Sequence, residues 1–207
     1  MGATHEVWLT TDTGTRLKLL ETFERLEYSM AFHQVGTCQL VLPGSFDKTL
    51  LQVDRKLCVS RAPEGGSMAL QRVYFIRKLT DNTDNDGNRR LTVFGLDGND
   101  LLRRRIVAYY AASAQASKTA VAADDMMKSV VNDNHSAGAP AARQLSTTYF
   151  TIQANATAGP VVTKEFAWRN VLSVLQDLVA TAIEAGTDVY FDVVRLNESQ
   201  FEFRSWI

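Results

Sequence analysis

The sequence predicts an α+β protein that is mainly antiparallel β-structure, with a small β-barrel followed by an α+β region of two helices and a closing hairpin. In the first hundred residues, short runs of alternating apolar and polar residues are separated by turn residues, which is typical of half-buried strands. In the second half, two segments carry apolar residues at helical spacing, and alternation returns at the end. We therefore expect two domains, a β-barrel over residues 1–107 and an α+β domain over residues 108–207.

The composition is that of a globular protein with balanced charge. Of the 207 residues, 45% are hydrophobic, which is enough for a packed core. The 22 Lys and Arg residues against 23 Asp and Glu give a formal net charge of -1, so no global field attracts a polyanion or an anionic membrane. We expect no specific nucleic-acid partner. No apolar run approaches the roughly 20 residues of a membrane helix, and the N-terminus lacks a secretion signal, so we expect a protein made in the cytoplasm.

Antiparallel hairpins account for most of the first hundred residues. Residues 26–32 and 38–42 carry apolar side chains at every second position on either side of a short turn, and they predict one hairpin. Residues 69–80 and 88–96 flank a stretch rich in Asp and Asn, and they predict another. A further strand is expected at residues 52–60.

Residues 15–25 fit a helix as well as two strands. We expect strands, because residues 12–14 (Asp-Thr-Gly) have the composition of a first hairpin turn.

Two helices are expected in the second half. The first begins near Ser117 or Thr119 as its N-cap and runs to Asn132. Its buried stripe consists of Ala123, Met126, Met127, Val130 and Val131. The second helix runs from Trp168 to Ile183, where apolar residues keep a helical period over four turns. Gly186 is placed to end it.

Residues 189–195 and 199–206 predict the closing hairpin. Its last strand carries Phe201, Phe203 and Trp206, and the sequence stops directly afterwards at Ile207. An apolar strand edge open to solvent is avoided in folded proteins. We therefore expect the second domain to be incomplete at its C-terminal end, or a partner chain to cover this edge.

Metal-site patterns are weak. Residues 82–87 place acids and amides at alternate positions before a glycine, but the first and twelfth positions of a calcium loop hold Asn82 and Val93. A solvated hairpin turn is the better interpretation. His5, His33 and His135 are scattered, without a second ligand at metal spacing.

Catalytic patterns are also weak. No nucleophile elbow occurs, and Cys38 and Cys58 lie on alternating apolar segments, where we expect buried, reduced thiols. Asp124 and Asp125 point about 100° apart on a helix, so they cannot act together on one substrate atom. Their ordinary role is a favourable charge near the helix N-terminus. We expect no enzyme, and no catalytic, cofactor-binding or metal-binding residues.

One basic and aromatic cluster remains, formed by Arg103, Arg104 and Arg105 followed by Tyr109 and Tyr110. Such a cluster could serve as an oligonucleotide platform or as a protein interface. The balanced total charge favours the interface, where arginine is common.

Several short segments, in the same order along nearly the whole chain, resemble the front part of bacteriophage baseplate hub, or tail-tip, proteins of the siphovirus minor tail protein type. The most informative is residues 91–107, where a buried strand breaks at Gly95 and continues through Leu96-Asp97 into a bulky, basic run. The other segments are residues 7–14, 26–29, 35–36, 40–43 and 54–55, the helices 120–132 and 168–183, and the following hairpin.

This resemblance implies a barrel hub domain with an insertion-type α+β domain, assembled as a homo-oligomeric ring, most often a trimer, at the virion tail tip. The ring would cap the tail tube and open for passage of the tape-measure protein and DNA during infection. It implies the tail tube or distal tail protein and other tail-tip or fibre proteins as partners, and synthesis in the cytoplasm of the infected bacterial host. Within it, we expect interface residues at Arg103, Arg104, Arg105, Tyr109, Tyr110, Phe201, Phe203 and Trp206.

Three alternatives remain open. A distal tail ring protein would be a hexamer with a similar strand count. A tail-associated cell-wall hydrolase needs clustered acids or a metal, which the sequence does not offer. A carbohydrate-binding barrel would bind free ligand as a monomer.

Overall fold

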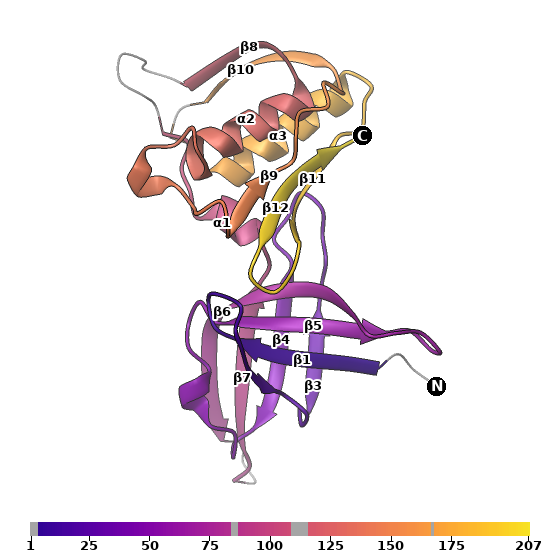
Figure 1. Cartoon of the computed structure of the whole chain (residues 1–207), viewed down its shortest axis with the longest axis vertical. Helices are drawn as coiled ribbons and strands as arrows, with labels where there is room; N and C mark the ends of the chain where they lie inside the picture. Colours follow the sequence, from indigo (N-terminus) through magenta and orange to yellow (C-terminus); the bar gives the residue numbers. More distant parts are fainter. Residues whose placement is uncertain (1–3, 84–86, 109–115, 167) are drawn as a thin grey trace. The chain divides into compact units, whose positions relative to one another are not determined.

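The computed structural model describes residues 4–83, 87–108, 116–166 and 168–207. The chain forms two compact units, coloured by sequence in Figure 1. Unit 1 consists of the described residues of Met1–Ala31, Val35–Gly98 and Arg195–Ser199. Unit 2 consists of the described residues of Phe32–Gln34, Asn99–Val194 and Gln200–Ile207.

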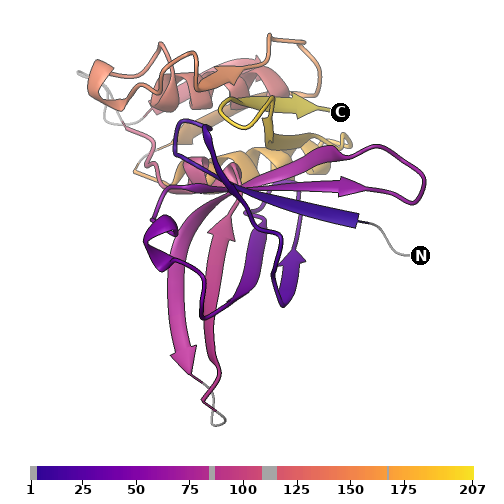
Figure 2. The same cartoon turned by 60° about the horizontal axis from the view of Figure 1, so that its bottom comes forward.

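Unit 1 is built on a seven-stranded antiparallel sheet. Its strand order is β2-β1-β5-β6-β7-β4-β3. The strands are β1 (Thr4–Thr10), β2 (Arg16–Leu19), β3 (Arg25–Tyr28), β4 (Thr37–Pro43), β5 (Lys56–Ala62), β6 (Ala69–Thr83) and β7 (Arg89–Leu96), with a 3-10 turn at Lys48–Leu50. The predicted hairpins β3–β4 and β6–β7 are confirmed. The ambiguous segment 15–25 is not helical, but it contains only one complete strand, β2, and the first residue of β3, because residues 20–24 lie in no strand. Figure 2 shows the β6–β7 hairpin reaching beyond the rest of the sheet.

The α+β class is confirmed, but the prediction of a closed barrel is wrong. β2 and β3 stand at opposite ends of the strand order and share no ladder. The chain between them is held by single backbone bonds instead: Leu20 N–H donates to Val7 O, and Glu24 N–H donates to Val41 O, both at 2.9 Å. Both edge strands have only four residues. Alternation in sequence shows that one face of a sheet is buried, and this is true of open and closed sheets alike.

One apolar cluster fills the inner face of this sheet. Its members are Val7, Leu9, Leu20, Cys38, Leu40, Leu42, Leu51, Leu57, Val59, Tyr74, Ile76, Leu91 and Val93. The strand predicted over residues 26–32 ends at Tyr28, however, and Met30 and Phe32 are 56% and 58% exposed. Ser29 N–H still donates to Thr37 O at 2.8 Å, so the ladder stops one residue later, where the chain leaves the sheet.

Unit 2 combines three helices with two small sheets. The helices are α1 (Asn99–Arg103), α2 (Ala123–His135) and α3 (Val171–Glu184), and α2 packs on α3 (Figure 1). β8 (Ala116–Ala122) and β10 (Val161–Phe166) form a two-stranded sheet, and β11 (Tyr190–Arg195), β12 (Phe201–Trp206) and β9 (Phe150–Ile152) form a three-stranded one in that order. A 3-10 turn spans Ala141–Arg143. The sequence did not predict α1, β8, β9 or β10.

α2 begins later than predicted and ends later. Ser117 and Thr119 are part of β8, which pairs with β10, so neither caps the helix. The helix starts at Ala123, whose N–H donates to Pro160 O at 2.9 Å, and Ala122 makes no side-chain cap. The predicted buried stripe is confirmed, because every one of its members is at most 1% exposed.

α3 begins at Val171, three residues after the predicted start. Asn170 is its N-cap, with a side chain that accepts from Ser173 N. Trp168 has a φ of 52° and is 63% exposed, so it lies outside the helix. Gly186, at a φ of 83°, follows the helix end as predicted.

The closing hairpin β11–β12 is confirmed, but the expected open apolar edge is not. β9 pairs with β12 in parallel, with Phe150 opposite Phe201 and Ile152 opposite Phe203. Phe201 and Phe203 are 1% and 0% exposed. The edge that looked open in the sequence is covered by a strand fifty residues earlier in the chain. No helix in the described part of the chain is long and apolar enough to cross a membrane.

Candidate functional site

The three arginines Arg103–Arg105, here called the arginine segment, comprise the last residue of α1 and the two residues that follow it, and they lie beside the start of α3. Ile106 forms a β-bridge with Asn170, and two backbone bonds flank it: Val107 N–H to Arg169 O at 2.7 Å and Val171 N–H to Arg105 O at 2.8 Å. The Asn170 amide also donates to the Arg103 carbonyl. The backbone of the segment is therefore fixed to the first turn of α3.

The three arginine side chains have different surroundings. Arg103 donates from Nε and Nη2 to Asp100 Oδ1, at 3.0 and 2.6 Å, although its side chain is 51% exposed. Arg104 is exposed. Arg105 turns inward and donates from Nη1 to Arg143 O at 2.7 Å and to Asn134 O at 3.4 Å, near the C-terminus of α2.

Arg105 and Arg143 each donate a side-chain hydrogen bond to the backbone of the other's segment. Arg143 Nη2 donates to Ile106 O at 2.6 Å and to Asn134 Oδ1 at 3.4 Å. Burial, followed by the charges of Arg143 and Arg104, lowers the pKa of Arg105 below its ordinary value. Three guanidinium groups thus lie within electrostatic range of one another at this place.

A small pocket opens beside these arginines. Leu101, Arg104, Arg105, His135 and Leu145 line it, and its volume is about 260 Å³; we call it the arginine pocket. His135 is fully buried, and its Nε2 lies 3.1 Å from Leu101 O, so Nε2 carries the hydrogen. Burial lowers the pKa of His135 to about 4, and the imidazole is neutral at pH 7.

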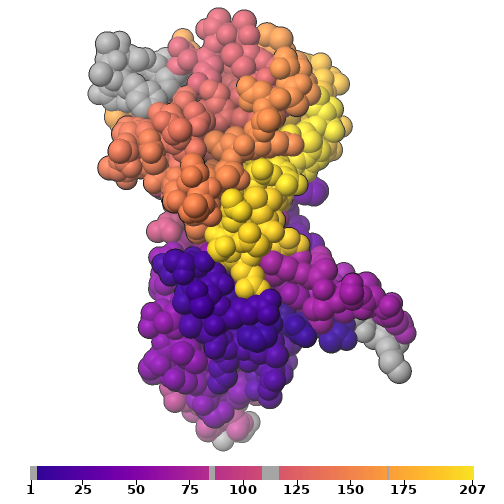
Figure 3. All heavy atoms as spheres, viewed as in Figure 1, coloured from indigo at the N-terminus to yellow at the C-terminus, as the bar shows by residue number. Residues whose placement is uncertain are grey.

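The other predicted interface residues are placed differently. Tyr109 and Tyr110 lie outside the described residues. Phe201 and Phe203 belong to the core of unit 2 and present no side chain to a partner. Of the three described residues in this set, only Trp206 is partly exposed; it lies on β12, whose end is coloured yellow in Figure 3.

Trp206 belongs to an aromatic cluster that the sequence did not reveal. Its ring lies 5.4 Å from that of Phe32 in a T-shaped contact and 6.1 Å from that of Tyr190 in a stack. Phe32 is 58% exposed. We call these three residues the aromatic face. No local signal pointed to it, because Phe32 is more than 150 residues from its partners in sequence.

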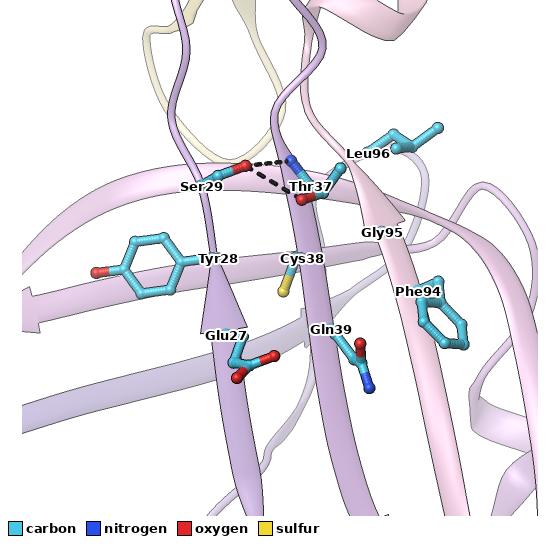
Figure 4. Close-up of a pocket in the computed structure, with 9 residues that line it drawn as sticks. All are labelled: Glu27, Tyr28, Ser29, Thr37, Cys38, Gln39, Phe94, Gly95 and Leu96. Atoms are coloured by element: carbon cyan, nitrogen blue, oxygen red, sulfur yellow. Dashed lines mark hydrogen bonds between the residues drawn. The ribbon is translucent and has the colours of Figure 1, made fainter.

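A second pocket, of about 450 Å³, lies in unit 1 over β3, β4 and β7 (Figure 4). Glu27, Gln39 and Phe94 come from these strands at one level of the sheet. Two bonds join Ser29 and Thr37: Ser29 Oγ lies 3.1 Å from Thr37 Oγ1 and accepts from Thr37 N at 3.0 Å. Burial raises the pKa of the Cys38 thiol to about 12. These groups form no nucleophile with an adjacent base.

Asp124 and Asp125 take part in a buried ion cluster. Lys128, 2% exposed, places Nζ 3.3 Å from Asp124 Oδ2 and 3.8 Å from Asp125 Oδ1. Asp125 also accepts from Ala156 N at 3.0 Å and from Thr157 N and Oγ1. The i,i+4 spacing of Asp124 and Lys128 was the available signal for this pair. The cluster fastens the segment around Thr157 to α2. No group of three or more His, Cys, Asp or Glu side chains suited to a metal occurs among the described residues.

The fold is found in solved structures of tail and VgrG proteins. A tail protein from Neisseria meningitidis MC58 matches with a TM-score of 0.55 and 13% identity, over 98% of this chain and 50% of that chain. A chain of a lidless PdpA–VgrG complex matches with a TM-score of 0.52 and 11% identity, over 99% and 35%. A chain of a half-lidded Francisella PdpA–VgrG complex matches with a TM-score of 0.50 and 9% identity, over 99% and 31%. This chain therefore spans half or less of their lengths.

Residues 4–203 match the family of siphovirus ReqiPepy6 Gp37-like proteins, and the chain belongs to that family. The predicted resemblance to siphovirus tail proteins is thereby confirmed. Comparison with curated protein sequences gave no match. Family and fold together support a structural role in a bacteriophage tail.

Proposed function

We propose that the chain is a non-enzymatic hub subunit of a phage tail tip, in which copies form a ring that caps the tail tube and opens for DNA passage. The observation that carries this proposal is the fold: nearly the whole chain, 98% of it, follows the backbone of a tail protein. Membership of a siphovirus family agrees with it. A trimeric ring at the virion tail tip is the form that we propose.

The distribution of charged groups supports a structural role. Buried ionisable groups in both units are used within the fold: Arg72 pairs with Asp97 in unit 1, and Lys128 with Asp124 in unit 2. Buried groups paired in this way connect segments of the chain. Because they are enclosed and bonded to each other, they cannot transfer protons to or from a substrate.

Two surfaces of unit 2 suit protein contacts. The arginine segment offers Arg104, and the aromatic face offers Phe32 and Trp206. Arginine and aromatic side chains dominate the energetics of protein interfaces. We propose both surfaces as contacts with neighbouring copies or with other tail proteins, such as the tail tube, distal tail, tape-measure or fibre proteins.

Native mass measurement of the purified chain tests the ring directly. We expect a trimer; a stable hexamer would favour a distal tail ring. Charge reversal at Arg104 and Arg105 should weaken the assembly, but reversal at Arg105 also removes its contacts with Arg143 O and Asn134 O. Arg104→Glu alone keeps these two Arg105 contacts, and we expect it to raise the dissociation constant of the assembly by about tenfold or more.

Arg61→Glu is the matched control, because Arg61 is an exposed arginine of β5 in unit 1 and the charge change is identical. Its assembly should equal that of the unaltered chain. A monomer that releases fragments from peptidoglycan, or equal assembly of Arg104→Glu and Arg61→Glu, would contradict this placement.

A further inference from the structure

We propose that a pocket of unit 1, at the turn formed by Arg195–Ser199, binds the carboxylate of an acidic side chain that belongs to another polypeptide. The pocket has a volume of about 670 Å³, and we call it the hairpin pocket. Its lining includes Arg16, Ala69, Leu70, Arg195, Leu196 and Glu198. All of its lining residues belong to unit 1, so this site is separate from the two surfaces of unit 2 that are proposed above as contacts.

The first argument is the positive charge of Arg195. Among the described residues, its guanidinium donates one hydrogen bond, from Nη2 to the Leu70 carbonyl oxygen. Its Nε is buried and has no hydrogen-bond partner. Burial, followed by the charge of Arg72, lowers the pKa of Arg195 below its ordinary value. A carboxylate in the pocket would therefore stabilise a guanidinium that the fold itself leaves only partly satisfied.

The second argument is that the other arginine of the pocket is already paired. Arg16 Nε donates to Glu198 Oε1 at 2.9 Å and to Oε2 at 3.1 Å, and Nη2 donates to Oε1 at 2.6 Å. The Arg16 guanidinium also lies 4.6 Å from the centre of the Trp8 ring. Among the lining residues, two arginines and one glutamate leave one positive charge in excess, at Arg195. One carboxylate balances that charge.

The third argument is that the wall of the pocket is held in place within unit 1. The fully buried Lys56 donates from Nζ to Glu198 O at 3.2 Å. Within the turn, Asn197 Oδ1 accepts from Ser199 N at 2.9 Å and from Ser199 Oγ at 2.8 Å. A pocket whose wall is fixed before binding loses less conformational entropy when a ligand enters.

The size and the apolar part of the lining favour a carboxylate that is carried on a peptide. Ala69, Leu70 and Leu196 offer apolar contacts to the stem of an Asp or Glu side chain. A volume of about 670 Å³ is larger than a single carboxylate group fills, and it lies in the usual range of ligand pockets, about 300–1,000 Å³. A phosphorylated side chain, with a charge of about -1.5 to -2 at pH 7, would exceed the one positive charge of the lining and would lie beside Glu198.

The test is a titration of the full chain, labelled with 15N, followed at the arginine Nε–Hε resonances at pH 7. The probe is the peptide Gly-Gly-Glu-Gly-Gly with both ends blocked, and the matched control is the same peptide with glutamine in place of glutamate. We expect a saturable shift at Arg195 with the glutamate peptide at millimolar concentration, and none with the glutamine peptide.

Three variants locate the binding. Arg195→Gln should weaken it by about fivefold or more, because glutamine carries no charge. Ala69→Trp should also weaken it, because a large side chain at this exposed position reduces the pocket while Arg195 stays intact. Arg55→Gln is the matched control and should leave binding unchanged. Arg55 is a further arginine of unit 1 whose guanidinium donates to a backbone carbonyl oxygen, that of Leu50, at 2.7 Å.

Equal shifts with both peptides, or equal losses for Arg195→Gln and Arg55→Gln, would overturn the proposal. Acetate that binds as tightly as the glutamate peptide would show that the pocket takes any small anion and no particular side chain. Tighter binding of the same peptide with phosphoserine in place of glutamate would show that the site is selective for phosphate.

Discussion

Removal of the Asp97 carboxylate is expected to destabilise unit 1 strongly. Asp97 directly follows β7 and is fully buried, and its Oδ2 accepts from Arg72 Nε at 3.1 Å and from Nη2 at 2.5 Å. The Arg72 side chain is only 9% exposed. Arg195 lies close enough that burial and then the charge of Arg72 lower its pKa. Asp97→Ala therefore leaves two guanidinium groups near each other without this counter-charge.

The size of the expected loss in stability follows from the burial of this ion pair. Breaking a buried ion pair by removal of one partner costs about 3–5 kcal/mol, since the remaining charge stays out of water. A domain has a total stability of about 5–15 kcal/mol, so much of the stability of unit 1 would be lost. The free energy of unfolding can be measured by urea titration, followed by far-UV circular dichroism and tryptophan fluorescence, to which Trp8 contributes from β1.

Two further variants make this measurement decisive. Glu24→Ala breaks the Glu24–Arg90 pair of 2.7 Å, whose side chains are 43% and 47% exposed, and should cost less than about 1 kcal/mol. The double variant Arg72→Met with Asp97→Leu removes both charges and should be more stable than Asp97→Ala alone. The reasoning is refuted if Asp97→Ala costs no more than Glu24→Ala, or if the double variant is the less stable.

Three other outcomes are expected. His135 is neutral in the folded chain, with a pKa of about 4 against 6.5 when unfolded, so the unfolded state binds the extra proton below pH 6.5. Stability should fall by about 2 kcal/mol between pH 7 and pH 5 and continue to fall toward pH 4, and a urea series should show a smaller fall for His135→Gln. Lys128→Met leaves the Asp124 carboxylate buried without its partner and should cost about 3 kcal/mol or more in the same assay; an unchanged midpoint would contradict the pairing. Gly36→Ala would place a Cβ 2.5 Å from Asp97 Oδ2, so the free energy of unfolding should fall by about 1–3 kcal/mol. A melting temperature equal to that of the unaltered chain would contradict this close approach.

The sequence was sufficient where structure depends on local periodicity. Alternation over residues 38–42 and 91–96 identified the buried side chains of β4 and β7, and helical spacing identified the stripes of α2 and α3. These patterns arise because a strand turns every second side chain, and a helix every third or fourth, toward the same face. The arginine segment was equally visible, since three adjacent arginines need no partner to be noticed.

Contacts between distant segments were decided only by the tertiary structure. β9 covers β12 from fifty residues away, and the Arg105 side chain turns inward because it meets the Arg143 carbonyl 38 positions later. The same holds for the open sheet, because the alternation within each strand does not show that β2 and β3, the two edge strands, share no ladder. The neighbours of a residue in sequence set the period and the face of its side chain, whereas its partner is set by how the whole chain packs. In this protein, that packing turns Arg105 inward and leaves the adjacent Arg104 exposed.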